Sequence, residues 1–490
     1  MARQLIEGVV FVCLFGTGLA SCGPVSVDVV PPADVVFFGS NIVTMDPNQP
    51  TVAAVAVRGE MIAAAGTLDE VMVLRDASTR VVDLGDGALL PGFIDAHGHF
   101  LGVGRALEAL SLHSPPVGDV NNIDDIVQKI EEWIVEKGIP PGEAVTGRGY
   151  ADSLLLEGRH PTAEDLDRAS TDHPIVLTHV SGHLSAVNTV ALEASDITAN
   201  TADPAGGHIR RVEGSMQDID DIQHDQTYRS GFRVAGVKLM LDGSPQGRTA
   251  WVTEPYEEGP PGAGPDYRAY GTMNTDRYKT WSAALIRRGV PFLAHANGDA
   301  AMDLMLDGVD EALSSMEVVP DHRSVIIHAQ LMRADQLDRA AVLNVVPSFF
   351  SAHAFFWGDW HRRSFGENRG NNISPVRWAL DRGVNFTVHN DAPIVPPDIM
   401  RLVSITVNRM TRSGHILGPH QRATIQEALH AVTLGAAYQY FEEDIKGSIT
   451  VGKQADLVIL ETNPLTTDPS QLEDIQVLET FSRGRSVHQQ

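Results

Sequence analysis

The central part of the chain alternates short apolar runs with helical patterns, and this alternation limits the choice of folds more than any other feature. The apolar runs include AVTGRGY, PIVLTHV, VAGVKLML, VPFLAHA, SVIIHAQ and VNFTVHNDA, and helical patterns such as NIDDIVQKIEEWIVEKG fall between them. Repeated β-then-α units over about 350 residues are typical of a (β/α)8 barrel. We therefore predict an α/β fold with a distorted (β/α)8, TIM-type barrel over residues 91–440, whose active site lies at the carboxyl ends of its strands.

Both ends of the chain contain short apolar segments separated by glycine-containing turns. ADVVFFGSNIVTM and VAAVAVRGEMIAAAG precede the barrel, and GSITVGKQADLVIL and VLETFSRGRSVHQQ follow it. Such segments are typical of β-strands, and two β-rich ends around a long centre suggest one module built from both. We expect residues 33–90 and 441–490 to form a small composite β-sandwich domain, preceded by a linker over residues 22–32.

The first 21 residues predict a secretory signal peptide of the lipoprotein type. An arginine near the start is followed by an apolar run, Val9 to Leu19, which is too short to span a bilayer comfortably. The stretch LASC, ending at Cys22, is similar to a bacterial lipobox, in which cleavage precedes a cysteine that receives lipid. We expect lipidation at Cys22 and export to the cell envelope, in the periplasm or at the outer membrane. An ordinary cleaved signal is the alternative.

Net charge and cysteine content exclude several classes of function. The net charge of −26 argues against nucleic acid as a partner and against electrostatic attachment to anionic lipid, so the lipid anchor is the only membrane contact expected. Cys13 and Cys22 are the only cysteines, so the mature chain has no thiol for a disulfide, a nucleophile or a thiolate metal site. Any chemistry therefore depends on His, Asp, Glu and Lys.

Polar side chains stand at or near the ends of several predicted strands. LLPGFIDAHGHF ends in Asp95, His97 and His99, which share a face if the stretch is a strand. Further apolar runs, 33 to 63 residues apart, contain Lys238, His295, His328 and Asp391. Because a βαβ unit takes about 30 residues or more, these intervals correspond to one or two units around a barrel. We therefore expect six of these side chains to meet at one end of the barrel, namely His97, His99, Lys238, His295, His328 and Asp391.

Imidazoles and carboxylates in this pattern are the ligands expected for zinc and similar divalent ions that activate water. We expect Asp95 to orient a ligand or a neighbouring loop. Lys238 stands out because a lysine inside an apolar strand must reach solvent, pair with a carboxylate or lose its charge. Two interpretations are open. Carboxylation by carbon dioxide would make Lys238 an anion able to bridge two cations, and a buried ion pair would give it a partner such as Asp242.

Several stretches of the chain resemble the amidohydrolase superfamily, namely LLPGFIDAHGHF, GVKLMLDGS, FLAHANGD, VIIHAQ, HNDAP and GKQADLVIL. More narrowly, they resemble its amidohydrolase-3 branch, which is YtcJ-like and similar to N-substituted formamide deformylases. The resemblance runs from about Ala33 to the end of the chain. It implies a distorted (β/α)8 barrel with a composite β-sandwich.

The same resemblance implies a ligand set for two metal ions. His97, His99 and Asp391 look like ligands of the first ion. His295 and His328 look like ligands of the second, and Lys238 looks like a carboxylated bridge between the two.

The resemblance also marks two further histidines. His183, in VSGHLSAVN, looks like a substrate contact. The stretch HNDAP departs from the family pattern, because many relatives carry Gly-Ser before the aspartate. His389 shares a strand face with Asp391, and we expect it to narrow the pocket or to add a hydrogen bond.

The function predicted on this basis is metal-dependent hydrolysis of an amide- or formamide-type C–N bond by a metal-activated hydroxide. Asp391 acts as general base and then acid, and His183 hydrogen-bonds the developing oxyanion. The expected cofactors are two divalent ions, zinc by preference, and the expected partner is a small-molecule amide; a homodimer is left open.

Two alternatives to this function remain. One is a mononuclear deaminase or a cyclic amide or ester hydrolase of the same superfamily, with Lys238 unmodified. The other is a degenerate, non-catalytic binding protein at the cell surface.

Overall fold

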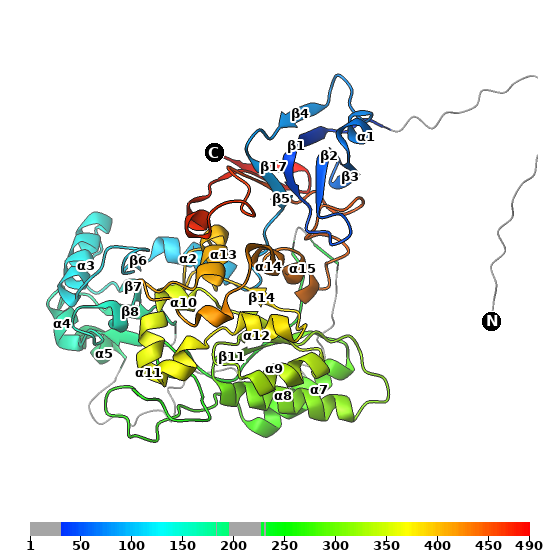
Figure 1. The fold of residues 1–490 in the computed structure, drawn as a ribbon. Helices are drawn as coiled ribbons and strands as arrows, with labels where there is room; N and C mark the ends of the chain where they lie inside the picture. Colours follow the sequence, from blue (N-terminus) through cyan, green and yellow to red (C-terminus); the bar gives the residue numbers. More distant parts are fainter. Residues whose placement is uncertain (1–30, 183, 196–226, 230–231) are drawn as a thin grey trace, which may run out of the picture.

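The computed structural model describes residues 31–182, 184–195, 227–229 and 232–490, and the strands of this part of the chain form three sheets. The largest sheet takes strands from both ends of the chain, in the order β17-β16-β15-β5-β1-β2-β3, with β4 paired to β1. Its strands are β1 Val35–Val43, β2 Thr51–Arg58, β3 Met61–Gly66, β4 Arg80–Asp83, β5 Ala88–Pro91, β15 Leu457–Leu460, β16 Val477–Ser482 and β17 Arg485–Gln489. The predicted pairing of the two ends in one β module is confirmed, and Figure 1 shows the blue and red strands side by side.

The second sheet is the frame of the functional site. It consists of five parallel strands in chain order, β10 Val237–Met240, β11 Phe292–Ala296, β12 Val325–His328, β13 Val346–Phe349 and β14 Thr387–Val388. Helices α7 Thr275–Arg287, α8 Asp299–Ser314 and α9 Ala334–Leu343 connect these strands and lie beside them in Figure 1. Because parallel strands in chain order place their carboxyl ends at one edge, the residues that follow them gather there.

The third sheet contributes three more parallel strands, β6 Leu110–Ser111, β7 Val145–Tyr150 and β8 Ile175–His179, with β9 Ser185–Val187 antiparallel to β8. The predicted alternation of strands and helices is therefore confirmed. Within the described residues, β6–β8 and β10–β14 form two separate hydrogen-bonded ladders, with no ladder joining them.

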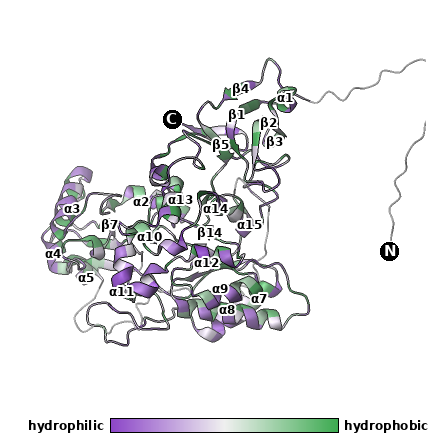
Figure 2. Cartoon of the chain, viewed as in Figure 1, coloured by the Kyte–Doolittle hydropathy of each residue, from purple (hydrophilic) through white to green (hydrophobic). Residues whose placement is uncertain are grey.

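The remaining helices follow the capping and packing signals of the sequence. They are α1 Leu68–Met72, α2 Phe100–Glu108, α3 Ile123–Lys137, α4 Ala163–Asp167, α5 Thr189–Ala194, α10 His353–Phe356, α11 Gly358–Asn371, α12 Val376–Asp381, α13 Ile399–Asn408, α14 Ile425–Ala431 and α15 Leu434–Gln439. In α3, the Asn122 side chain caps the first turn and Gly138 ends the helix in the left-handed region. Figure 2 shows that the helices carry both hydrophilic and hydrophobic residues, as amphipathic elements packed on a core do. No helix in the described ranges has the length and apolar content needed to cross a bilayer.

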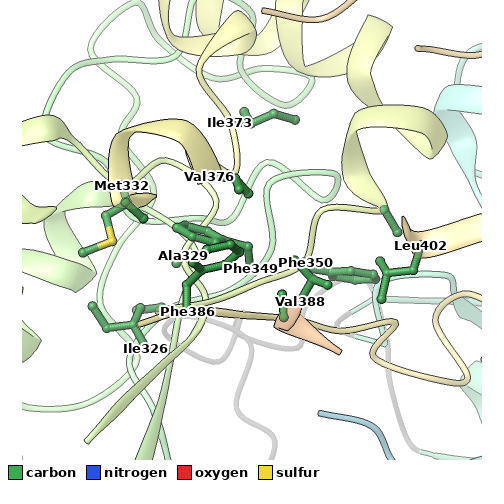
Figure 3. Packing of buried hydrophobic residues seen from close by; sticks show 14 of the residues in the cluster. Ile326, Ala329, Met332, Phe349, Phe350, Ile373, Val376, Phe386, Val388 and Leu402 are labelled. Atoms are coloured by element: carbon green, nitrogen blue, oxygen red, sulfur yellow. The ribbon is translucent and has the colours of Figure 1, made fainter. Parts of the chain in front are cut away.

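A dense apolar layer lies under the carboxyl ends of β12, β13 and β14. In Figure 3, Phe350 lies beside Val388 and Leu402, and Phe349 lies beside Phe386, with ring centroids 5.9 Å apart. Phe349, Phe350, Val388 and Leu402 are each at most 2% exposed. Such close packing holds neighbouring side chains in single rotamers. The polar residues that follow these strands therefore stand on a rigid base.

One sequence prediction about local structure is wrong. Asp95, His97 and His99 do not lie on a strand, because β5 ends at Pro91 and the chain then runs without regular structure to α2. The two halves of the stretch that suggested one long strand lie in different parts of the structure. Leu89 and Leu90 pair with β15 in the large sheet, and the residues after Pro91 cross to the second sheet.

Candidate metal centre

Two loops bring His97, His99 and Asp391 together. The Nε2 atoms of His97 and His99 lie 3.4 and 3.2 Å from the same carboxylate oxygen, Oδ1 of Asp391. That oxygen is buried and has no hydrogen-bond partner within the described part of the chain. A buried carboxylate oxygen without a donor is costly unless a cation or a proton satisfies it. The three ligand atoms therefore surround a place suited to a cation.

Backbone hydrogen bonds fix this arrangement. The Asp391 N–H donates to the carbonyl of His97 (3.1 Å), and the His99 N–H donates to the carbonyl of Ala392 (2.6 Å). Asp391 adopts a φ of 53°, which is uncommon for a residue with a side chain. Strained backbone of this kind persists where the surrounding contacts hold it, and it clusters at functional sites.

Asp95 connects the same two loops through hydrogen bonds with Asn390. Its two carboxylate oxygens accept hydrogen bonds from the backbone N–H and the side-chain amide of Asn390, at 3.0 and 3.2 Å. Burial raises the pKa of Asp95, and the two bonds from Asn390 oppose that shift. Asp95 therefore lies against the loop that carries Asp391, as expected for a residue that orients a neighbouring loop.

His295 and His328 form a second pair at the ends of β11 and β12. His295 Nε2 donates to the carbonyl of Gly243 (2.9 Å), because a carbonyl oxygen can only accept. His295 Nδ1 therefore keeps its lone pair, and it lies 3.1 Å from Nε2 of His328. Both side chains are buried, at 5% and 3% exposure of the residue. Ring nitrogens this close in a buried site are suited to share a cation.

Lys238, on β10, lies close to His97. Its Nζ is 2.8 Å from Nε2 of His97. Burial lowers the pKa of Lys238, and burial followed by the charge of Lys238 lowers the pKa of His97 well below its usual value. Burial therefore increases the fraction of neutral amine at this position, and the neutral amine is the form that reacts with carbon dioxide.

The alternative of a buried ion pair between Lys238 and Asp242 is not found among the described residues. β10 ends at Met240, and Asp242 lies beyond it. Its carboxylate accepts hydrogen bonds from the backbone N–H groups of Trp251, Asn297 and Gly298, at 2.7 to 3.2 Å. Asp242 is thus committed to the loops around His295 and does not neutralise Lys238.

His389 makes two hydrogen bonds in the buried space behind the metal-ligand candidates. Its Nδ1 lies 2.9 Å from Ser348 Oγ and its Nε2 lies 3.1 Å from Nδ1 of His328. The ring is fully buried and stacks on Phe350, with centroids 5.2 Å apart. Of the two expectations for His389, the structure shows an added hydrogen bond.

Sequence reasoning missed a second cluster, Asp152, His160 and His179, at the carboxyl ends of β7 and β8. His179 Nδ1 accepts from the Ser181 N–H (3.2 Å), so its Nε2 carries the proton and donates it to Asp152 Oδ1 (3.1 Å). His179 is thus satisfied without a cation. The signal available in the sequence was only that His179 ends a predicted strand.

Two predicted site residues, His183 and Cys22, lie outside the described residues. The predicted signal peptide lies outside them as well.

The geometry defines a class of site: imidazoles and a carboxylate, grouped as candidate metal ligands on loops at the carboxyl ends of parallel strands. Comparison with known proteins agrees. The sequence model of the amidohydrolase family matches residues 80–216 and 214–488. The chain belongs to the amidohydrolase family, and it is a metal-dependent hydrolase.

Curated relatives cover nearly the whole chain. It is 24% identical to the N-substituted formamide deformylase of Arthrobacter pascens, over 92% of this chain and 97% of that protein. It is 23% identical to the putative amidohydrolase YtcJ of Bacillus subtilis (strain 168), over 93% and 99%.

Solved structures show the same fold. A metal-dependent hydrolase of Pyrococcus furiosus matches with a TM-score of 0.65 at 22% identity, covering 88% of this chain and 100% of that one. A metal-dependent hydrolase of Pyrococcus horikoshii OT3 matches with a TM-score of 0.67 at 21% identity, covering 89% and 99%.

Proposed function

We propose that this protein hydrolyses the C–N bond of a small amide, of the formamide type or closely related, at a centre of two divalent cations. The observation that carries the proposal is the buried, unpartnered Oδ1 of Asp391 between the Nε2 atoms of His97 and His99. A carboxylate and imidazole nitrogens are the donors that zinc and related ions prefer. The similarity to the Arthrobacter relative, an N-substituted formamide deformylase, supports the substrate class.

His97, His99 and Asp391 would hold the first ion, and His295 and His328 the second. Lys238 would join them after carboxylation, in which the neutral Nζ attacks the carbon of carbon dioxide and loses one proton to solvent. The product is an anion with two oxygens, placed beside His97 Nε2. When bound, the two ions supply a water of lowered pKa and polarise the substrate carbonyl.

In this reaction Asp391 carries out the proton transfers. Its Oδ1 faces the ligand nitrogens and lies in a site where Asp95 and Asn390 hold the loop. A carboxylate so placed takes a proton from the attacking water and returns it to the departing nitrogen, as general base and then acid. His183 remains the predicted hydrogen-bond donor to the developing oxyanion.

The test of this function is a hydrolysis assay with and without metal. Purified protein is incubated with N-formyl amines, N-acyl amino acids and lactams, and the release of the amine is measured. We expect turnover of at least one class, loss of most activity after prolonged chelation, and its recovery when zinc, cobalt or manganese is returned. Hydrolysis that survives complete removal of metal would contradict the proposal.

A further inference from the structure

We propose that His389 is a positioning residue: it ends a buried, one-directional chain of hydrogen bonds that fixes the tautomer of His328, so that the Nε2 lone pair of His328 faces its metal ion. The chain runs through Gln439, Thr387, Ser348 and His389 to His328. This inference rests on the proposed function, since it concerns the ligand of a bound ion.

The donor-to-acceptor direction of this series of hydrogen bonds is determined at the backbone carbonyl of Ala96. Gln439 Nε2 lies 3.0 Å from the carbonyl oxygen of Ala96, which can only accept, so the amide nitrogen points there. The amide oxygen of Gln439 must therefore face Thr387, whose Oγ1 is 2.7 Å away. An amide oxygen has no proton to give, so the Thr387 hydroxyl donates to Gln439.

The next two bonds follow from this assignment. Thr387 Oγ1 lies 2.7 Å from Ser348 Oγ as well and could donate to it, but its single proton is engaged by the amide oxygen of Gln439, which has no other way to be satisfied in this contact. We therefore assign the donor role between the two hydroxyls to Ser348. Ser348 has then used its own proton, and its oxygen accepts from His389 Nδ1 at 2.9 Å. His389 therefore carries its proton on Nδ1.

The chain ends on the predicted metal ligand. His389 is fully buried against Phe350 and forms no ion pair with a described carboxylate, so a charged ring would have no compensating partner. We therefore take the ring as neutral, with a lone pair on Nε2. That lone pair accepts from His328 Nδ1 at 3.1 Å, which places the only ring proton of neutral His328 on Nδ1. His328 Nε2 is left with a lone pair, directed at the Nδ1 of His295.

Burial keeps the donor and acceptor roles of these groups from exchanging. Ser348, Thr387 and His389 have no exposed surface, and Gln439 and His328 are 2% and 3% exposed. Bulk solvent therefore does not reach these groups to supply an alternative donor or acceptor.

His295 Nε2 lies 2.9 Å from the carbonyl oxygen of Gly243 and 3.1 Å from Nδ2 of Asn297. Because the carbonyl accepts only from a protonated Nε2, we assign the lone pair of His295 to Nδ1. In this form His295 Nδ1 and His328 Nε2 face each other as lone pairs, which repel each other unless a cation lies between them.

The experiment measures metal affinity in variants that break the chain at two places. Thr387→Val keeps the shape of the side chain and removes the hydroxyl, so Ser348 is free to reverse its proton. His389→Leu removes the acceptor of His328. Matched controls are Thr406→Val and His353→Leu, which are buried to the same extent and lie outside the chain. Affinity for the second Co²⁺ is determined by competition with a chelator, with the absorption spectrum as readout, and folding is checked by circular dichroism.

We expect Thr387→Val and His389→Leu to bind the second ion roughly 10- to 100-fold more weakly, as found for residues that orient metal ligands, while both controls stay within about twofold of the parent. Equal affinity in the parent and in Thr387→Val, or an equal loss in Thr406→Val, would overturn the inference and leave the proposed function in place. A parent protein that binds no metal would overturn both.

Discussion

Asp391→Asn is expected to lower kcat for amide hydrolysis by about 10²- to 10⁴-fold, the usual contribution of a positioned acid–base group. Asparagine keeps an oxygen beside His97 and His99, so the first ion should still bind, but its amide does not take up a proton near neutral pH. Steady-state kinetics on the best substrate and metal analysis of the same sample separate the two effects.

The control for this variant is Asp338→Asn, an exposed aspartate paired with Arg382 at 2.7 Å on the protein surface. It carries the same chemical change away from the site, and kcat should remain unchanged. Near-normal turnover by Asp391→Asn would remove Asp391 from the proton transfer.

Lys238→Ala is expected to lower the metal content from about two ions per chain to one or fewer, and kcat by a comparable or larger factor than Asp391→Asn. The reason is that the bridging anion between the ions depends on Nζ, which only lysine supplies in β10. Alanine also leaves a space at this position. A small carboxylate such as formate or acetate should enter it, replace the missing anion and restore part of the activity.

Lys279→Ala serves as the control, since Lys279 pairs with Glu311 at 2.8 Å on the outside of α7. Its metal content and kcat should match those of the parent. If Lys238→Ala keeps two ions and full activity without added carboxylate, Lys238 is not a bridge, and the mononuclear alternative becomes the better account.

The sequence allowed the fold class and the main site candidates to be predicted because both depend on local patterns. Apolar runs with period-two and helical spacing mark the strands and helices, and the polar residue at the end of each run marks its carboxyl end. Chain order then brings His295, His328 and Asp391 to one edge of the second sheet, at the ends of β11, β12 and β14.

What the sequence could not predict depends on contacts between distant segments. The residues after Pro91 leave the strand pattern because the loop after β14 holds them, through Asp391 and Ala392. Asp242 shares a strand face with Lys238 by spacing alone, but three backbone N–H groups from other loops take its carboxylate. The chain of bonds behind His328 likewise joins residues up to 343 positions apart.

The most direct test of the central claim is the metal content of the folded parent protein, measured by elemental analysis after expression with divalent metal and bicarbonate and after removal of loosely bound ions. The account predicts about two divalent ions per chain. A fully folded protein that holds no tightly bound ion under these conditions would contradict it.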